Sequence, residues 1–353
     1  MKNILIITQK VDENDDLLGF FVGWLREFSK KFDKIFVITL GKGEYNLPAN
    51  VFIYSLGKER GSNKISRFFN FYKLLFKLVP KSKGIFSHMS PIFAISSWPV
   101  AFLFGKKVFL WYLHRSLTFR LKIAEKLCSK ILTADKGSLT IKSRKIIELG
   151  HGIDIEKFRT RRDWNDTISS KRFSILSVGR ISKIKDYETL IKVAKILKDE
   201  GLKFKVKIIG RPVMPYDFEY FEKVKKLIQG SELENFIEFA GFVPYSQIAD
   251  YYKEADIFIN LAPKGGLDKA VLEAMAAGCL TLVANEVFKK YFGDFSQLLI
   301  FRYGNPDDLS QKIENLLELS KDELNNISNF LQGSVERSHN LFNTVDKISE
   351  LFN

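Results

Sequence analysis

The chain has 353 residues, of which 46% are hydrophobic, and its formal net charge is +14. This length allows two domains that each bury a core, and the composition, with 32 Phe, excludes a disordered chain. The charge is uneven, because residues 1–165 hold 30 Lys and Arg against 14 Asp and Glu, a net +16, whereas the remaining residues sum to −2.

At the N-terminus, Met1-Lys2-Asn3 leads directly into the strand-like Ile4–Ile7, and no run of about 18 uncharged apolar residues follows anywhere. We therefore expect neither a signal peptide nor a spanning helix. Cys128 and Cys279 lack paired metal-ligand spacing and the four His are scattered, so we expect no structural zinc and a reducing, cytoplasmic compartment.

Short apolar segments alternate with helical patterns along the whole chain, as in a doubly wound parallel sheet. We predict a first series of strands at residues 4–8, 34–40, 51–56, 84–87, 107–112, 130–134 and 145–149. A second series is predicted at 173–178, 205–209, 236–239, 257–261, 280–284 and 298–301. The two α/β domains, 1–160 and 161–335, would meet at a linker near 156–170. The last fifty residues have a helical pattern, and we expect 336–353 to be a helix that returns to the first domain.

The first loop, Gln9–Phe20, is acidic. Asp15, Asp16 and Gly19 lie where they could contact hydroxyl groups of a ligand in a crevice. A solvated acidic turn that caps the next helix explains the same pattern equally well.

Residues 64–83 form a predicted basic helix dense in aromatic side chains. Its Phe and Leu face would pack on the first sheet, and its cations could contact anionic lipid at a membrane surface. The basic first half predicts a polyanionic partner, although a general enrichment in Lys produces part of such an excess. Nucleic acid is disfavoured, because the basic residues accompany no known reading module.

Two strands of the first half are each followed by a histidine, His88 and His114. A lone His in such a place is more often a hydrogen-bonded structural imidazole than a catalytic group.

In the second half, Arg180 and Lys185 follow an apolar strand and precede a predicted helix. Ligands bind at such turns in open α/β sheets, so two fixed cations there suit a diphosphate, although basic loop residues are often only solvated charge. Further on, Gly265-Gly266 open a helix whose N-terminus favours an anion, or simply form a tight turn. Glu273 lies in that otherwise apolar helix and needs a partner, such as two ribose hydroxyls.

Five ordered segments resemble retaining glycosyltransferases of family four. They are Gly150–Phe158, Val178-Gly179-Arg180 with Lys185, Phe239–Val243, Ala255–Ile259 and Leu272–Gly278. The resemblance is close over about 150–284 and loose before it. It implies the GT-B fold, in which two Rossmann-like domains face a central cleft, the first binding the acceptor and the second a nucleotide-sugar.

The resemblance also implies roles for individual residues. Arg180 and Lys185 would hold the donor diphosphate and stabilise the leaving group, Glu273 would hold the ribose, and His114 would lie at the reacting centre. His88 is a weaker candidate for the reacting centre. It would bind the acceptor together with Asp15, Asp16 and Gly19 of the first loop. The full set of donor-binding residues is Gly179, Arg180, Lys185, Val243, Gly265, Gly266, Leu267, Asp268 and Glu273.

One position departs from the family pattern. The family has a glutamate eight residues before Glu273, near the transferred sugar, where this chain has Gly265. Either the backbone of Gly265, Gly266 and Leu267 or the carboxylate of Asp268 would take over its role. The sugar itself is therefore left open.

The resemblance implies a hexosyltransferase-like enzyme that retains anomeric configuration and needs neither metal nor cofactor, since the two cations can do the electrostatic work. Its donor would be a UDP-, GDP- or ADP-sugar and its acceptor a glycan or lipid-linked glycan. We expect a cytoplasmic protein, peripheral on the inner face of the membrane. The alternatives are a GT-B nucleotide-sugar epimerase and a non-catalytic GT-B scaffold protein.

Overall fold

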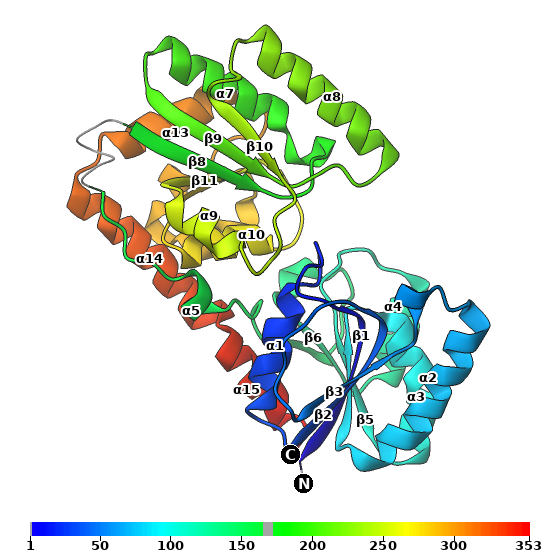
Figure 1. The fold of residues 1–353 in the computed structure, drawn as a ribbon. Coiled ribbons are helices and arrows are strands. Elements are labelled where there is room, and N and C mark those ends of the chain that lie inside the picture. The colour runs from blue at the N-terminus through cyan, green and yellow to red at the C-terminus, as the bar shows by residue number, and fades with distance from the viewer. Residues whose placement is uncertain (1, 165–171) are drawn as a thin grey trace. The chain divides into compact units, whose positions relative to one another are not determined.

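The structure is a computed structural model, and it describes residues 2–164 and 172–353. The chain divides into two compact units (Figure 1). Unit 1 holds the residues up to Asp154 together with Pro244–Ser246 and Ser338–Asn353, and unit 2 holds Ile155–Val243 and Gln247–Arg337. Of the linker predicted near 156–170, residues 165–170 lie outside the described part.

Unit 1 is built on a seven-stranded parallel sheet with the strand order β3-β2-β1-β4-β5-β6-β7. The strands are β1 (Asn3–Val11), β2 (Lys34–Lys42), β3 (Val51–Ser55), β4 (Gly84–His88), β5 (Lys107–Trp111), β6 (Lys130–Thr133) and β7 (Ile146–Glu148). The helices are α1 (Phe20–Ser29), α2 (Lys64–Leu78), α3 (Pro91–Leu103), α4 (Phe119–Leu127) and α15 (Leu341–Glu350). All seven strands of the first predicted series are confirmed.

The two faces of this sheet bury different cores, because side chains alternate along a strand. Ile4 and Ile6 of β1 pack with α1 and α15, whereas Leu5 and Ile7 pack with α2, α3 and α4. Figure 1 shows these two groups of helices on opposite faces of the sheet. Strands that are apolar on both faces are typical of parallel sheets covered by helices on both sides.

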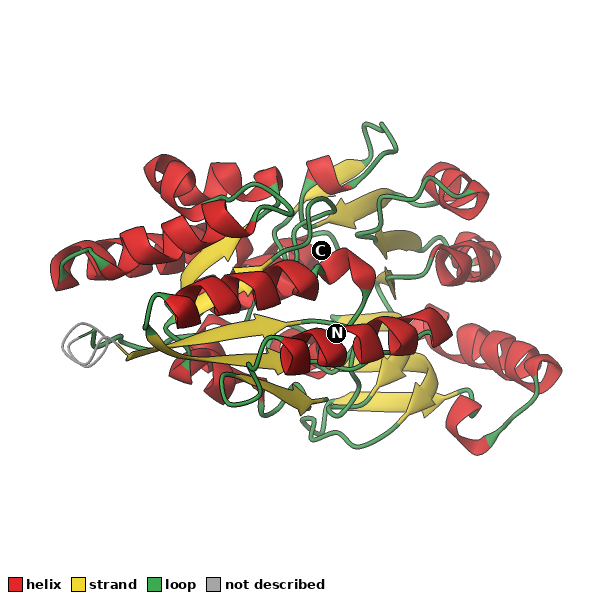
Figure 2. Ribbon diagram, turned by 90° about the horizontal axis from the view of Figure 1, so that it is seen from above, coloured by secondary structure: helices red, strands yellow, loops and turns green. Residues whose placement is uncertain are grey.

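Unit 2 has a five-stranded parallel sheet with the order β10-β9-β8-β11-β12. The strands are β8 (Arg172–Val178), β9 (Lys203–Ile209), β10 (Ile237–Gly241), β11 (Ile257–Asn260) and β12 (Leu280–Val283). The helices are α5 (Ile155–Phe158), α7 (Tyr187–Asp199), α8 (Pro215–Gly230), α9 (Ile248–Glu254), α10 (Lys269–Ala276), α11 (Lys289–Phe292), α12 (Ser296–Leu299), α13 (Pro306–Leu317) and α14 (Lys321–His339). Helices α7, α8 and α13 pack together, α5, α9 and α10 pack together, and helices flank the strands in both views (Figures 1 and 2).

One predicted strand is wrong. Residues 296–299 form α12, and only Ile300 makes an isolated parallel bridge, to Val283 of β12. The chain leaves the sheet edge at once, because the N–H of Arg302 bonds to the Asp308 carboxylate at the start of α13. The helical pattern of the last fifty residues is confirmed by α13, α14 and α15.

Candidate active site

The polar residues of unit 2 gather at one point of its sheet. Strand β8 lies between β9 and β11, so the chain winds away from β8 in both directions, and ligands of open α/β sheets bind at such a switch point. Arg180 and Lys185 follow β8, and Asn260 ends β11. The loop after β11 leads to Asp268, which is the N-cap of α10.

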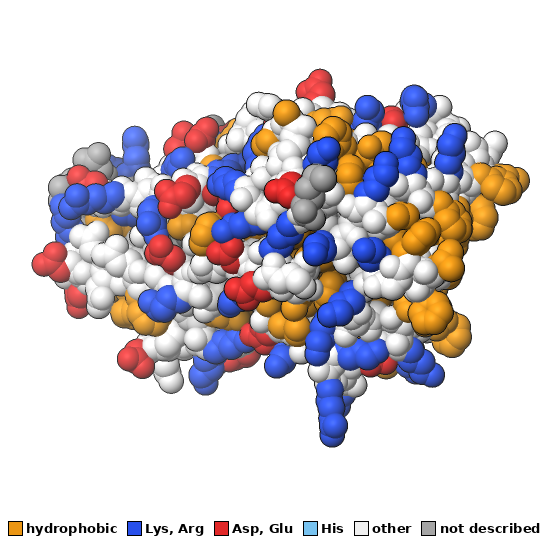
Figure 3. Space-filling model, turned by 90° about the horizontal axis from the view of Figure 1, so that it is seen from below, with side chains coloured by type: hydrophobic (Ala, Val, Ile, Leu, Met, Phe, Trp, Pro, Cys, Tyr) orange, Lys and Arg blue, Asp and Glu red, His pale blue; other side chains and the backbone are white. Residues whose placement is uncertain are grey.

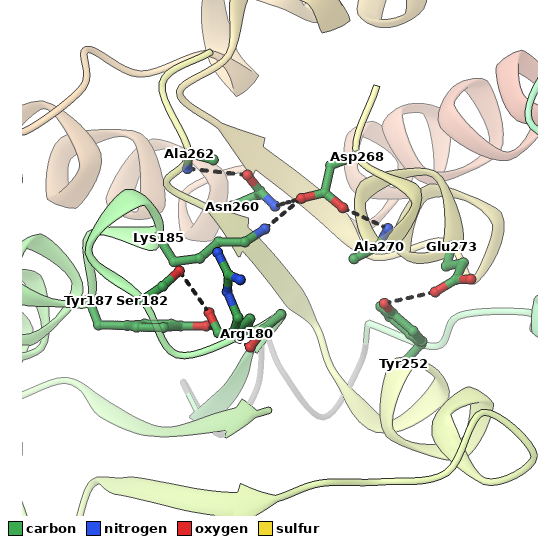
Figure 4. A network of polar contacts seen from close by, with 11 residues as sticks. Arg180, Ser182, Lys185, Tyr187, Tyr252, Asn260, Ala262, Asp268, Ala270 and Glu273 are labelled. Carbon is green, nitrogen blue, oxygen red and sulfur yellow. Dashed lines mark hydrogen bonds and ion pairs between the residues drawn. The ribbon is translucent and has the colours of Figure 1, made fainter. Parts of the chain in front are cut away.

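Lys185 and Asp268 form an ion pair across this point, with Nζ and Oδ2 2.6 Å apart. The same oxygen accepts the side-chain N–H of Asn260 at 2.9 Å, and Oδ1 accepts the N–H of Ala270 at 3.2 Å (Figure 4). Burial raises the pKa of the Asp268 carboxyl, but the charge of Lys185 and these hydrogen bonds outweigh it, so the pKa lies below its ordinary value. Both oxygens of Asp268 are thus engaged within the protein.

Arg180 points into the same region (Figure 4) and keeps 45% of its side chain exposed. Its Nε lies 3.5 Å from Oδ2 of the fully buried Asp217. Asp217 also accepts the backbone N–H groups of Val213 and Met214, at the start of α8. The Nε side of the guanidinium is therefore held by a fixed carboxylate, and its other two nitrogens can donate hydrogen bonds to an anion.

Gly179 makes room for the lysine. Its φ is +152°, and a Cβ atom there would lie 2.8 Å from Cε and 3.1 Å from Nζ of Lys185. A side chain at this position would push Lys185 out of its place.

Glu273 lies in α10 with 5% of its surface exposed, and its Oε2 accepts the hydroxyl of Tyr252 at 3.1 Å. The predicted donor residues of the loop lie just before the helix: Gly265 and Gly266 are partly exposed and Leu267 is buried. A Cβ atom at Gly265 would meet no heavy atom within 4 Å. Val243 is half-buried and follows β10, the edge strand of the sheet.

Sequence reasoning missed three members of this group: Asn260, Asp217 and Tyr252. A polar residue at the carboxyl end of the apolar β11 was a usable signal for Asn260. Asp217 and Tyr252 lie in ordinary amphipathic helices, and only the tertiary structure brings them to Arg180 and Glu273.

A family model described as "Glycosyl transferases group 1" matches residues 158–330, the segment that carries this geometry. Through this segment the chain is similar to that family. The amylovoran biosynthesis glycosyltransferase AmsK of Erwinia amylovora is 35% identical over 141 residues, 38% of this chain and 32% of AmsK. The alpha-monoglucosyldiacylglycerol synthase of Streptococcus pneumoniae is 33% identical over 106 residues, 30% of this chain and 22% of the synthase. The chain thus spans about a third or less of these relatives' length.

The likeness of this chain to solved structures extends over almost its whole length. The crystal structure of Anabaena HepE in complex with UDP matches with a TM-score of 0.76 and 15% identity, covering 99% of both chains. At this identity the match establishes the fold, two Rossmann-like domains of the GT-B class, and confirms the predicted fold class.

Unit 1 also has a switch point, between β1 and β4. His88 ends β4 there and is fully buried: its Nδ1 lies 3.1 Å from Oγ1 of Thr8, and its ring stacks on Phe21 at 3.8 Å. Contact between His88 and an acceptor would require this packing to open. His114 follows β5, is exposed, and lies edge-on to Tyr112 at 5.5 Å.

The acidic loop after β1 is organised by its own contacts. Asp15 accepts the N–H groups of Leu17 and Leu18 and lies 2.9 Å from Nζ of Lys10. Burial raises the pKa of Asp15, but these partners outweigh it and leave the pKa below its ordinary value. Asp16 is exposed, and Gly19 is buried at the N-cap of α1.

Within residues 2–164 and 172–353, no three or more His, Cys, Asp or Glu side chains lie together as ligands for a metal ion would. None of the helices in this described part combines the length and the apolar character that crossing a bilayer demands.

Proposed function

We propose that this protein is a glycosyltransferase that moves a sugar from a nucleotide-sugar to a hydroxyl of a glycan or lipid-linked glycan, with retention of anomeric configuration. The carrying observation is that Arg180 and Lys185 follow β8 at the switch point, and that Glu273 lies in the helix capped by Asp268, the ion-pair partner of Lys185, all within the segment that matches the family model. Two cations are complementary to a diphosphate, and a carboxylate can accept hydrogen bonds from two ribose hydroxyls.

In this proposal Arg180 and Lys185 bind the donor diphosphate and offset the charge that develops on it as the glycosidic bond breaks. The acceptor hydroxyl attacks from the face that the diphosphate leaves, and a phosphate oxygen takes its proton. Fixed cations supply the charge stabilisation that a bound metal gives other transferases. His114, exposed after β5, is proposed to contact the donor sugar.

The nucleotide is proposed to be held by the ribose through Glu273. HepE, which shares the fold, was crystallised with UDP, and this supports a uridine nucleotide as the first candidate. Because both oxygens of Asp268 are engaged, we assign contact with the sugar to the backbone of Gly265, Gly266 and Leu267.

Removal of the cations tests the diphosphate site. Arg180→Ala and Lys185→Ala should each lower transfer by about 100-fold, as loss of one charge-stabilising group does, and should abolish thermal stabilisation by UDP-, GDP- or ADP-sugars. Lys223→Ala, a surface lysine of α8, is the control that should leave both unchanged. Unchanged ligand stabilisation and transfer in the first two variants would refute the assignment. Analysis of the products with and without acceptor separates a transferase from an epimerase.

We further propose that unit 1 docks on an anionic membrane through an aromatic patch on α2 and the end of α3. The patch consists of exposed side chains, with Phe69 67% and Phe102 71% exposed, and its members are Ile65, Phe68, Phe69, Phe76, Phe102, Leu103 and Phe104. The rings of Phe76 and Phe104 lie 6.4 Å apart, so the two helices share one surface. Figure 3 shows hydrophobic side chains gathered at the right edge of its view, among Lys and Arg.

Charge and hydrophobicity are complementary to such a membrane. Lys73 and Lys77 are exposed on α2 beside the patch, and each cation near an anionic surface contributes about 1 kcal/mol. The Streptococcus relative is named for a diacylglycerol lipid, which supports a lipid-facing site.

Vesicle co-sedimentation tests the docking. Phe68→Ser with Phe69→Ser, and separately Lys73→Glu with Lys77→Glu, should each weaken binding to vesicles rich in anionic lipid by about tenfold or more. Phe218→Ser and the pair Lys192→Glu with Lys226→Glu are matched exposed controls in unit 2. The proposal would be refuted if vesicle binding changed neither with salt concentration nor in the α2 variants.

A further inference from the structure

The carboxylate of Glu273 is buried in a helix whose neighbouring side chains are apolar. Val271, Leu272, Ala274 and Met275 are all fully buried around it. A carboxylate in such surroundings must be held by specific partners, and its direction decides which hydroxyls it can accept. The hydroxyl of Tyr252, from α9, is one partner, at 3.1 Å from Oε2 (Figure 4).

Tyr252 is itself immobilised at both ends. Its backbone carbonyl accepts Nη2 of Arg162 at 2.6 Å and the thiol of Cys279 at 3.1 Å. Its ring is fully buried between Phe158, edge-on at 5.5 Å, and Phe258 at 5.7 Å. The hydroxyl therefore has a fixed position that does not depend on Glu273.

Arg162 extends this support into the segment that precedes β8. Its guanidinium also donates to the carbonyls of Ala277 and Lys253, at 3.0 and 2.8 Å. These acceptors lie at the ends of α10 and α9, so one side chain holds the two helices that carry Glu273 and Tyr252.

We propose that Tyr252 is a positioning residue: its hydroxyl holds the Glu273 carboxylate in the orientation that accepts both ribose hydroxyls of the donor, and so sets the selectivity for ribonucleotides. The inference rests on the proposed function, in which Glu273 binds the ribose. Burial, followed by the nearby Glu273 charge, raises the pKa of Tyr252 well above its ordinary value, so the phenol keeps its proton and donates at all working pH values.

The readout is the ratio of dissociation constants for a 2′-deoxynucleoside diphosphate and its ribo form, measured by calorimetry. UDP and 2′-deoxy-UDP are the probes, and the GDP and ADP pairs are used if the wild type does not bind UDP. Tyr252→Phe should lower this ratio by about five- to tenfold, the effect of losing one hydrogen bond of typical strength, with diphosphate binding otherwise retained. Tyr220→Phe is the matched control, because it removes another buried hydroxyl of unit 2, one that accepts the N–H of Tyr187.

Glu273→Gln distinguishes a failure of the Tyr252 inference from a failure of the proposed ribose site. If Glu273→Gln lowers the ratio and Tyr252→Phe leaves it unchanged, Tyr252 has only a packing role and the inference fails while the proposed function stands. If Glu273→Gln also leaves the ratio unchanged, or the wild type binds no nucleotide, the ribose site itself is wrong. Should Tyr252→Phe not fold, Arg162→Lys, which keeps the charge but not the contacts to the Tyr252 carbonyl, should lower the ratio by about two- to threefold. An unchanged ratio in that variant would likewise overturn the inference.

Discussion

At the scale of single residues, Gly179 has a role that no other amino acid could fill without moving Lys185. Gly179→Ala should weaken donor binding by more than its effect on stability explains, because the new methyl group would lie 2.8 Å from Lys185 Cε. Gly201→Ala is the control: its φ of +77° is also unfavourable for Ala, at about 1–2 kcal/mol, but open space surrounds it. Calorimetry measures donor binding and thermal unfolding measures stability in both variants. If Gly201→Ala lost as much donor affinity as Gly179→Ala, the role assigned to Gly179 would be wrong.

Asp268 gives the fold a dependence on pH with a definite sign. Its folded-state pKa is lowered, so the ionised carboxylate stabilises the protein above the unfolded pKa of about 3.9, and this contribution is lost as the pH falls through the folded value. Asp268→Asn should therefore be less stable than the wild type near pH 7, and the difference should shrink from about pH 4 downwards. Urea unfolding across pH 3–7 measures it, with exposed Asp307→Asn as the control. A difference that stays constant would contradict the expectation.

The site residues that the sequence could indicate are those with local signatures. Arg180 and Lys185 follow a clear strand, and Glu273 stands out as a charge among apolar helix positions. Tyr252, Asp217 and Asn260 reach them from other elements, and a single sequence does not encode such proximity locally. The burial of His88 could likewise not be predicted from the sequence, because it depends on Phe21 of α1 stacking on the His88 ring.

At the scale of elements, the strands were predicted well because parallel strands covered on both faces are continuous apolar runs. Residues 298–301 show the limit of that signal. Leu298, Leu299 and Phe301 look like a strand, but the segment must bury its side chains in a short helix before one bridging residue reaches β12. Apolar runs of four residues do not separate these two structures.

The first turn of helix α8 contains Asp217, whose carboxylate also lies 3.5 Å from Nε of Arg180. Asp217→Ala would leave the N–H groups of Val213 and Met214, at the start of the helix, without their acceptor, and should lower the free energy of unfolding by about 1–2 kcal/mol. It should also weaken nucleotide binding through Arg180. Asp322→Ala, in the exposed first turn of α14, is the matched control and should cost under about 1 kcal/mol. Urea unfolding compares the two, and equal costs would show that Asp217 is not a structural acceptor.

At the scale of the whole molecule, the order of segments along the chain does not match their division into the two units. Unit 1 is completed by residues 338–353, which follow all of unit 2 in sequence. The N–H of Leu341 bonds to the carbonyl of Ile153 and the N–H of Ile153 to the carbonyl of His339, so the backbone at Ile153 runs beside that at His339–Leu341. Helical periodicity predicts α15 as a helix, but which sheet face its apolar side covers is a matter of tertiary structure.

This arrangement predicts that the C-terminal helix stabilises unit 1. Ile348 is fully buried against the α1 side of the first sheet, so Ile348→Ala should lower the free energy of unfolding of unit 1 by about 2–5 kcal/mol. Phe342→Ala, on the same helix but 49% exposed, removes more atoms and should cost less. Tryptophan fluorescence follows the right transition, because Trp24, Trp98 and Trp111 lie in unit 1 and only Trp164 in unit 2. If Ile348→Ala left that transition in place while Phe342→Ala shifted it, α15 would not pack on unit 1 through this face.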